Sequence, residues 1–171
     1  MGSTLTVDNI VGATTAANVK MPAGAVLQVI QAHTTTETAI NSGERAYSDV
    51  AGVTAAITPK YSDSKVLVRI MVSYYHNGQS DSGALRILRG STVVYDDIHN
   101  IGYTGNSDQS GGVTTFEYLD SPSTTSATTY GIYLRCATAG QACVNKSHRD
   151  SNESGYDMRT ASSITAMEIA G

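Results

Sequence analysis

Residues 116–134 constrain the fold of this chain more than any other segment, because they read as two strands separated by a turn. Phe116 and Tyr118 lie on one face of the first strand. Tyr130, Ile132 and Leu134 lie on one face of the second. Apolar residues at every second position are typical of strands with one buried face. The turn is built from Ser, Thr, Ala and Pro, so we expect a β-hairpin that serves as scaffold and carries no catalytic group.

The strongest strand signal, Lys65–His76, is apolar on both faces. One face holds every second residue from Val66 to Tyr74. The other face is partly apolar through Leu67, Met71 and Tyr75. A strand that is apolar on both faces is often covered on both. Since a sandwich covers only one face, we expect a subunit interface to cover the other.

The rest of the chain predicts further short strands and no long helix. Apolar alternation or β-branched runs occur at 25–32, 53–57, 84–89, 91–95, 142–146 and 160–169, separated by long polar loops at 33–47, 96–112 and 147–158. Charged residues make up only 15% of the chain, and no segment repeats apolar residues with the helical period. We therefore predict an all-β protein, an antiparallel β-sandwich or jelly roll over residues 25–171.

Residues 1–24 are rich in Ala, Gly, Thr and Asn and carry too little apolar mass for a core. We expect them to form an extended N-terminal arm that attaches to a partner or is exchanged between subunits. The net charge of −4 argues against nucleic acid as a partner, because phosphate binding needs a basic face. The sequence contains no run of 18 apolar residues, so it does not predict a helix that crosses a membrane. The N-terminus lacks the pattern of a signal peptide, so we expect folding in a cytoplasm.

Catalytic and metal-binding motifs do not stand out. The four histidines, His33, His76, His99 and His148, lie in or beside predicted loops without metal-ligand spacing, which favours exposed polar side chains. The pair Asp96-Asp97 and the run 149–153 offer oxygen atoms, but not in the order of a calcium loop. We therefore predict a protein that is not an enzyme and that needs no cofactor or metal.

Two cysteines, Cys136 and Cys143, flank a short segment that contains Ala139-Gly140. If these two residues form a tight turn, the cysteines face each other across a hairpin. Their Cα atoms would then lie about 5.5 Å apart, which a disulfide tolerates. Folding in a cytoplasm favours reduced thiols instead. The sequence leaves both states open.

Tyrosine dominates the aromatic residues, with ten Tyr, one Phe and no Trp. Tyr95, Tyr103 and Tyr156, like Tyr47 and Tyr75, lie in or near predicted loops, where a ring can stack on a sugar. Tyrosine is equally suited to subunit contacts, because it has an apolar body and a polar tip. Tyr95, Tyr103 and Tyr156 are our candidates for contact with a host surface glycan.

Several motifs together resemble one group of proteins. These are the N-terminal STLTVDNIVGATTAANVKMPAG, then ITPKYSDSKVLVRIMVSY, LRILRGSTVVYDD, LDSPSTTSATTYGIYL and the C-terminal SSITAMEIAG. The chain resembles tail-fibre-like and virion surface structural proteins of bacteriophages, especially phages of aquatic bacteria and cyanobacteria. The resemblance implies a β-sandwich subunit, usually trimeric, located in the virion and assembled in the host cytoplasm. It implies no catalytic residues.

We accordingly expect a non-enzymatic phage virion protein, a homotrimeric tail-fibre or fibre-tip subunit joined to other virion proteins through residues 1–24. A capsid decoration protein on the phage head is the first alternative, because a chain of 171 residues suits a small fibre tip and a capsid-surface knob equally. A lectin-like module that binds host glycan is an alternative of another class. It shares the expected fold and differs in where binding takes place.

Overall fold

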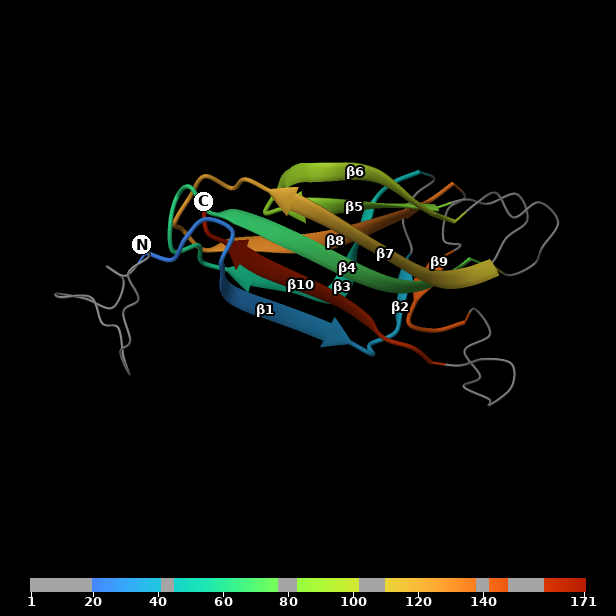
Figure 1. The fold of residues 1–171 in the computed structure, drawn as a ribbon. Coiled ribbons are helices and arrows are strands. Elements are labelled where there is room, and N and C mark those ends of the chain that lie inside the picture. Colours follow the sequence, from blue (N-terminus) through green and yellow to red (C-terminus); the bar gives the residue numbers. More distant parts are fainter. Residues whose placement is uncertain (1–19, 41–44, 77–82, 102–109, 138–141, 148–158) are drawn as a thin grey trace.

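The computed structural model describes residues 20–40, 45–76, 83–101, 110–137, 142–147 and 159–171 (Figure 1). These residues form strands and connecting turns. The strands are β1 (Val26–Thr34), β2 (Thr38–Ile40), β3 (Ser48–Ile57), β4 (Lys65–His76), β5 (Gly83–Arg89), β6 (Thr92–Ile101), β7 (Ser110–Asp120), β8 (Thr128–Cys136), β9 (Ala142–Val144) and β10 (Ser162–Ile169).

The strands form two antiparallel sheets that pack face to face (Figure 1). In the first, called the β4 sheet, β10 lies between β1 and β4, β7 pairs with the opposite edge of β4, and the short β9 and β2 extend the sheet beside the end of β4. In the second, called the β8 sheet, the order is β3-β8-β5-β6. The long strands thus follow the order β1-β10-β4-β7 against β3-β8-β5-β6, which is the arrangement of a jelly roll. The predicted all-β sandwich is confirmed.

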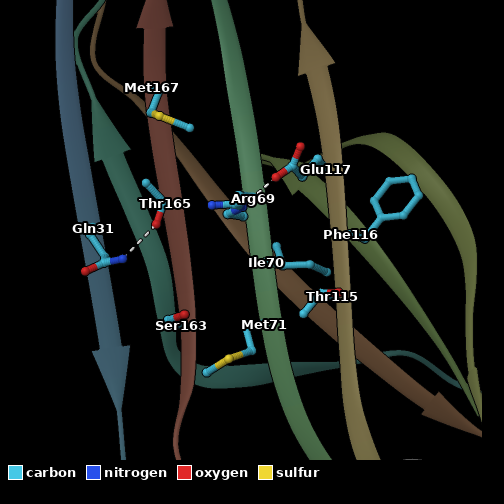
Figure 2. Close-up of a pocket in the computed structure, with 10 residues that line it drawn as sticks. All are labelled: Gln31, Arg69, Ile70, Met71, Thr115, Phe116, Glu117, Ser163, Thr165 and Met167. Carbon is cyan, nitrogen blue, oxygen red and sulfur yellow. Dashed lines mark hydrogen bonds and ion pairs between the residues drawn. The ribbon is translucent and has the colours of Figure 1, made fainter.

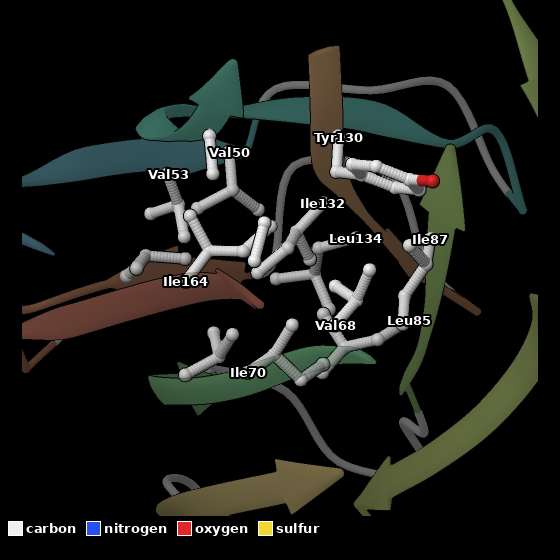
Figure 3. Close-up of a cluster of buried hydrophobic side chains, with 14 of the residues drawn as sticks. Val50, Val53, Val68, Ile70, Leu85, Ile87, Tyr130, Ile132, Leu134 and Ile164 are labelled. Carbon is white, nitrogen blue, oxygen red and sulfur yellow. The ribbon is translucent and has the colours of Figure 1, made fainter. Parts of the chain in front are cut away.

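The hydrophobic core lies between the two sheets (Figure 3). The β4 sheet contributes the even-numbered residues of β4 and β10, including Val68, Ile70 and Ile164, which are all fully buried. The β8 sheet contributes Tyr130 and Ile132 of β8, together with their neighbours on β3 and β5. The period-two pattern of the sequence therefore correctly predicts the buried faces of β4 and β8.

The predicted hairpin at 116–134 is wrong, although both of its strands exist. β7 pairs with β4 in one sheet, whereas β8 pairs with β3 and β5 in the other. The Ser/Thr-rich connection therefore crosses from one sheet to the other. Alternation fixes which face of a strand is buried, but it does not identify the strand that pairs with it.

A buried ionic cluster joins the two sheets where this connection leaves β7. Asp120, the last residue of β7, is only 7% exposed. Its Oδ2 accepts hydrogen bonds from Arg89 Nη1 at 2.7 Å and from the Tyr130 hydroxyl at 2.6 Å. Burial, followed by the contact with Asp120, raises the pKa of the Tyr130 hydroxyl. The hydroxyl therefore stays protonated and acts as the donor that Asp120 needs.

Two of the predicted polar loops contain strand residues. The segment 33–47 includes the end of β1 and all of β2, and the segment 96–112 includes the end of β6 and the start of β7. Gly111 belongs to β7 because the Tyr75 ring of β4 covers it: a Cβ atom at this position would lie 2.4 Å from the ring. The aromatic residue thus fills the space that a glycine leaves on a strand. Most of the third predicted loop, 147–158, lies outside the described residues.

A buried amide joins β9 to β1 and β10. Asn145 is fully buried and has a φ of +63°. Its Nδ2 donates to the carbonyl oxygens of Thr34 and Thr36 at 3.1 and 2.9 Å, and its Oδ1 accepts from the Ser162 hydroxyl at 2.7 Å. The Ser162 oxygen in turn accepts from the backbone N–H of Ser73. Asparagine is one of the few residues that adopt a positive φ readily, so it meets the backbone and the side-chain requirement at once.

We expect Asn145→Ala to lower the free energy of unfolding by about 2–4 kcal/mol, because it leaves buried carbonyl and hydroxyl groups without their partner. Urea unfolding followed by circular dichroism measures this change. Ser123→Ala is the matched control: Ser123 also has a positive φ, of +51°, but is exposed, and we expect a change within about 0.5 kcal/mol. Equal effects of the two substitutions would contradict a role for the buried amide.

Candidate interaction surface

The outer face of the β4 sheet carries a row of apolar side chains that lie in register on four neighbouring strands. We call the position of such a row along the strand direction its height. Val29 pairs with Met167, Met167 with Leu67, and Leu67 with Leu119. We call these four residues the apolar row. Val29 is 55% exposed and Leu119 is 46% exposed. Apolar side chains in direct cross-strand register thus face solvent, on the side of the sheet opposite the core.

The next height on the same face is polar. Gln31, Thr165, Arg69 and Glu117 are cross-strand neighbours there and are called the polar row. The Gln31 amide donates to the Thr165 hydroxyl at 3.0 Å, and Arg69 forms an ion pair with Glu117 (Figure 2). The two sets of partners divide the row into an uncharged half on β1 and β10 and a charged half on β4 and β7.

An open depression of about 680 Å³ lies over the polar row. Met167 and Met71 are at its two ends, and Thr115 and Ser163 belong to its lining (Figure 2). Flexible thioether side chains adapt to irregular partner surfaces, and scattered hydroxyls add hydrogen-bonding capacity. This face therefore has the mixed composition of a surface that binds another macromolecule.

The outer face of the β8 sheet carries a cluster of paired charged and aromatic groups around Arg86. Arg86 donates to both carboxylate oxygens of Asp96, at 3.1 and 3.0 Å, and its guanidinium lies 3.4 Å from the centre of the Tyr47 ring. The Tyr47 hydroxyl also donates to Asp96 at 3.0 Å. Of the two outer faces, the β4 sheet has the more accessible apolar surface.

The first described residues of the chain lie against one end of the sandwich. The backbone N–H of Gly24 donates to the Ala170 carbonyl at 2.8 Å, which joins the segment before β1 to the segment after β10. Lys20 forms an ion pair with Asp63 at 2.9 Å in the turn before β4. The last five residues of the predicted arm, 20–24, thus already contact the sandwich.

A buried carboxylate fixes the turn between β3 and β4 at this end. Glu168 of β10 is fully buried. It accepts hydrogen bonds from Gln28 Nε2 at 2.6 Å, from the Ser64 hydroxyl at 2.7 Å and from the Lys60 N–H at 2.7 Å. Burial alone would raise the pKa of Glu168, but these hydrogen bonds outweigh it and the pKa is lowered. The ionised carboxylate therefore holds β1, β10 and the turn together.

Of the three candidate glycan-binding tyrosines, only Tyr95 lies among the described residues. Tyr95 lies within β6, not in a loop, and is 37% exposed. Its ring packs against Phe116 and Tyr118 of β7, with ring centres 4.6 and 5.3 Å away, so it helps to close the gap between the two sheets. Tyr103 and Tyr156 lie outside the described residues.

The expectation of exposed histidines is wrong for His76. This residue ends β4 on the core side and is fully buried, with its ring edge-on to Tyr74. The even-numbered face of β4 stays buried to the last residue, which the polar sequence that follows does not reveal. His33 is exposed, whereas the side chain of His99 and all of His148 are outside what the structure describes.

The oxygen-rich segments do not form a metal site within the described residues. Asp96 is engaged with Arg86 and Tyr47, as described above, and the run 149–153 is not among the described residues. No group of three His, Cys, Asp or Glu side chains in the described part of the chain is placed to hold a metal ion. In the same residues there is no helix of the length and hydrophobicity needed to cross a membrane.

The structure does not place Cys136 and Cys143 opposite each other across a hairpin. Cys136 pairs with Gly83 of β5 in the β8 sheet, whereas Cys143 pairs with Tyr75 of β4 in the β4 sheet. Both side chains are buried, and no disulfide joins them. The Cys143 thiol instead donates to the Lys146 carbonyl at 3.2 Å. The segment between the cysteines connects two sheets, so the geometry assumed for a bridge does not arise.

Comparison with known proteins finds similarity only at the level of structure. No protein-family model matches the chain, and no curated protein sequence matches it. Chains from three solved structures of infectious bursal disease virus align with it. The chain from the Gx strain has a TM-score of 0.49 and 10% identity, and the alignment covers 84% of this chain and 32% of that chain. For the VP2 subviral particle the TM-score is 0.46 and the identity 12%, with 84% and 33% of the two chains covered; for the Gt strain they are 0.45 and 11%, with 87% and 39% covered. The chain thus spans about a third of the length of the viral chains that it resembles.

We expect the stability of the protein to fall at acidic pH in part through Glu168. Its pKa in the folded chain is lower than the ordinary value of 4.5. The stabilisation from the carboxylate is therefore complete above pH 4.5 and is lost as the pH falls through the folded-state pKa. Glu168→Gln removes this dependence, and it lowers the free energy of unfolding at pH 7 by about 1–3 kcal/mol.

Urea unfolding of both proteins between pH 3 and pH 7 tests this expectation. The difference in unfolding free energy between the wild type and Glu168→Gln should narrow as the pH falls. Glu117→Gln is the control, since the Glu117 carboxylate is half exposed and lies on the outer face. A constant difference across the range for Glu168→Gln would contradict the role of the ionised carboxylate.

Proposed function

We propose that the protein is a non-enzymatic structural subunit of a bacteriophage virion, a homotrimeric tail fibre or fibre tip. The observation that carries this proposal is the exposed apolar row of the β4 sheet, which suits an interface with other subunits. The jelly-roll order of the strands and the sequence motifs that resemble phage virion proteins support the same role. In this role the sandwich is a building block, and its function is to bind copies of itself and neighbouring virion proteins.

The two ends of the sandwich suit different tasks. The described chain begins and ends at one end, where Gly24 meets Ala170, and we propose that residues 1–24 provide the attachment to other virion proteins there. The opposite end is where β4, β6 and β8 finish and where β5, β7 and β10 begin (Figure 1). We propose that the first end is attached to the particle and that the second projects away from it.

A capsid decoration protein is the alternative within the same class. It would use the same arm and the same sandwich, so the fold favours neither location. An image reconstruction of the particle distinguishes them, because density for the sandwich would lie either on the tail or on the head.

A lectin-like role is the alternative of another class, favoured by the aromatic cluster of Tyr95, Phe116 and Tyr118. If the protein binds a host polysaccharide through this cluster, Tyr95→Ala should remove the signal on a glycan array, whereas Val93→Ala, at an exposed position of the same strand, should keep it. Absence of any signal for the wild type would leave only the structural role.

We expect a variant that lacks residues 1–19 to fold and to fail to join the particle. The truncation keeps the Lys20–Asp63 ion pair and all strands of the described residues, so its urea unfolding should match that of the full chain. Incorporation is measured by quantifying the variant in purified particles from a phage that lacks the wild-type gene, with full-length protein supplied as the control. Normal incorporation of the truncated protein would count decisively against attachment through the arm.

A further inference from the structure

The outer face of the β4 sheet consists of two halves that complement each other at two neighbouring heights, those of the apolar row and the polar row. At the height of the apolar row, β1 and β10 present Val29 and Met167, and β4 and β7 present Leu67 and Leu119. At the height of the polar row, the first half presents amide and hydroxyl groups, whereas the second presents the Arg69–Glu117 pair. The β1–β10 half therefore matches the β4–β7 half in apolar content and offers it uncharged hydrogen-bonding partners.

We propose that three copies of the chain pack with these outer faces turned inward, around a three-fold axis parallel to the strands of the β4 sheet. This inference rests on the proposed homotrimer and specifies its interface. Rotation about an axis parallel to the strands leaves the height of every residue unchanged. The β1–β10 half of each copy therefore meets the β4–β7 half of the next copy row against row.

This arrangement satisfies both rows. The apolar rows of three copies form one continuous apolar layer around the axis, in which Val29 lies beside Leu119 of the next copy. One step along the strands, about 7 Å away, Gln31 lies beside Glu117 of the next copy, where its amide can donate to the carboxylate. A two-fold axis perpendicular to the strands at the polar row would instead set Arg69 against Arg69, which is unfavourable.

The width of the sheet also suits three copies. Four strands spaced about 4.8 Å apart make a face roughly 19 Å wide. In a triangle with sides of this length, the centre lies roughly 5.5 Å from each side. Face-to-face sheets pack about 10 Å apart, so each extends about 5 Å to their midplane. Three such faces can therefore meet around the axis at the height of the apolar rows, whereas the depressions over the polar rows leave space beside it.

Two single substitutions test the interface by light scattering of the full chain. The wild type is expected at about 54 kDa, which is three times the chain mass of 17.9 kDa. Val29→Glu and Leu119→Glu, one on each half, should each give a monomer of 17.9 kDa, because they place a charge in the apolar layer. Both positions are half exposed in the single chain, so circular dichroism should show an unchanged fold.

Val93→Glu is the matched control, because Val93 is 41% exposed but lies on β6 of the other sheet. This variant should remain a trimer. If Val29→Glu and Leu119→Glu also remain trimers, the proposed interface is wrong while the homotrimer stands. A wild type that is itself monomeric would overturn the homotrimer and this inference together.

A cysteine pair tests the direction of the axis. In Gln31→Cys/Glu117→Cys, each engineered thiol lies beside that of the next copy, so mild oxidation should give a covalent trimer on a non-reducing gel. Gln31→Cys/Val113→Cys is the control, because Val113 lies four residues farther along β7 and outside disulfide reach. The native Cys136 and Cys143 are buried. Cross-linking of the control, or none in either variant, would overturn the row-against-row packing.

Discussion

Strand β4 is the element on which both the core and the outer surface depend. It pairs with other strands along both edges, and its side chains contribute to both faces of the sheet. β10 and β7 pair with its two edges, and the residues from Val66 to Met71 are paired on both sides. Its even-numbered side chains enter the core, and its odd-numbered side chains stand in the middle of the outer face. Any change in the position of β4 would therefore move the core and the outer face together.

The sequence predicts the faces of the strands well and their partners poorly, for physical reasons. Alternation in β4 and β8 reports directly which side chains avoid water, and burial of Val68, Ile70 and Ile132 follows from it. Pairing depends on residues far apart in the chain, so the segment 116–134 looks like a hairpin although its strands belong to different sheets. The sequence around Gly111 is typical of a loop, because Tyr75, whose ring covers this glycine, is distant in sequence.

The candidate surface is predictable only in part. The two-sided apolar pattern of β4 indicates that Leu67 and Met71 face away from the core. It does not indicate that Val29, Met167 and Leu119 join Leu67 at the same height, because this requires the register of three strand pairs. For Tyr95 the reason is related: the proximity of a tyrosine to a predicted loop does not reveal that its ring packs against a neighbouring strand.

The two buried polar clusters of β10 have a consequence for how this strand finds its place. A shift of β10 by two residues along β4 would keep every apolar side chain on the correct face, so hydrophobicity alone distinguishes such slipped pairings weakly. Ser162, at the start of the strand, bonds to Asn145, and Glu168, near its end, bonds to Ser64. Such a shift would leave the buried Ser162 and Glu168 without their hydrogen-bond partners at the same time. The two polar clusters therefore specify a single register of β10 against β4.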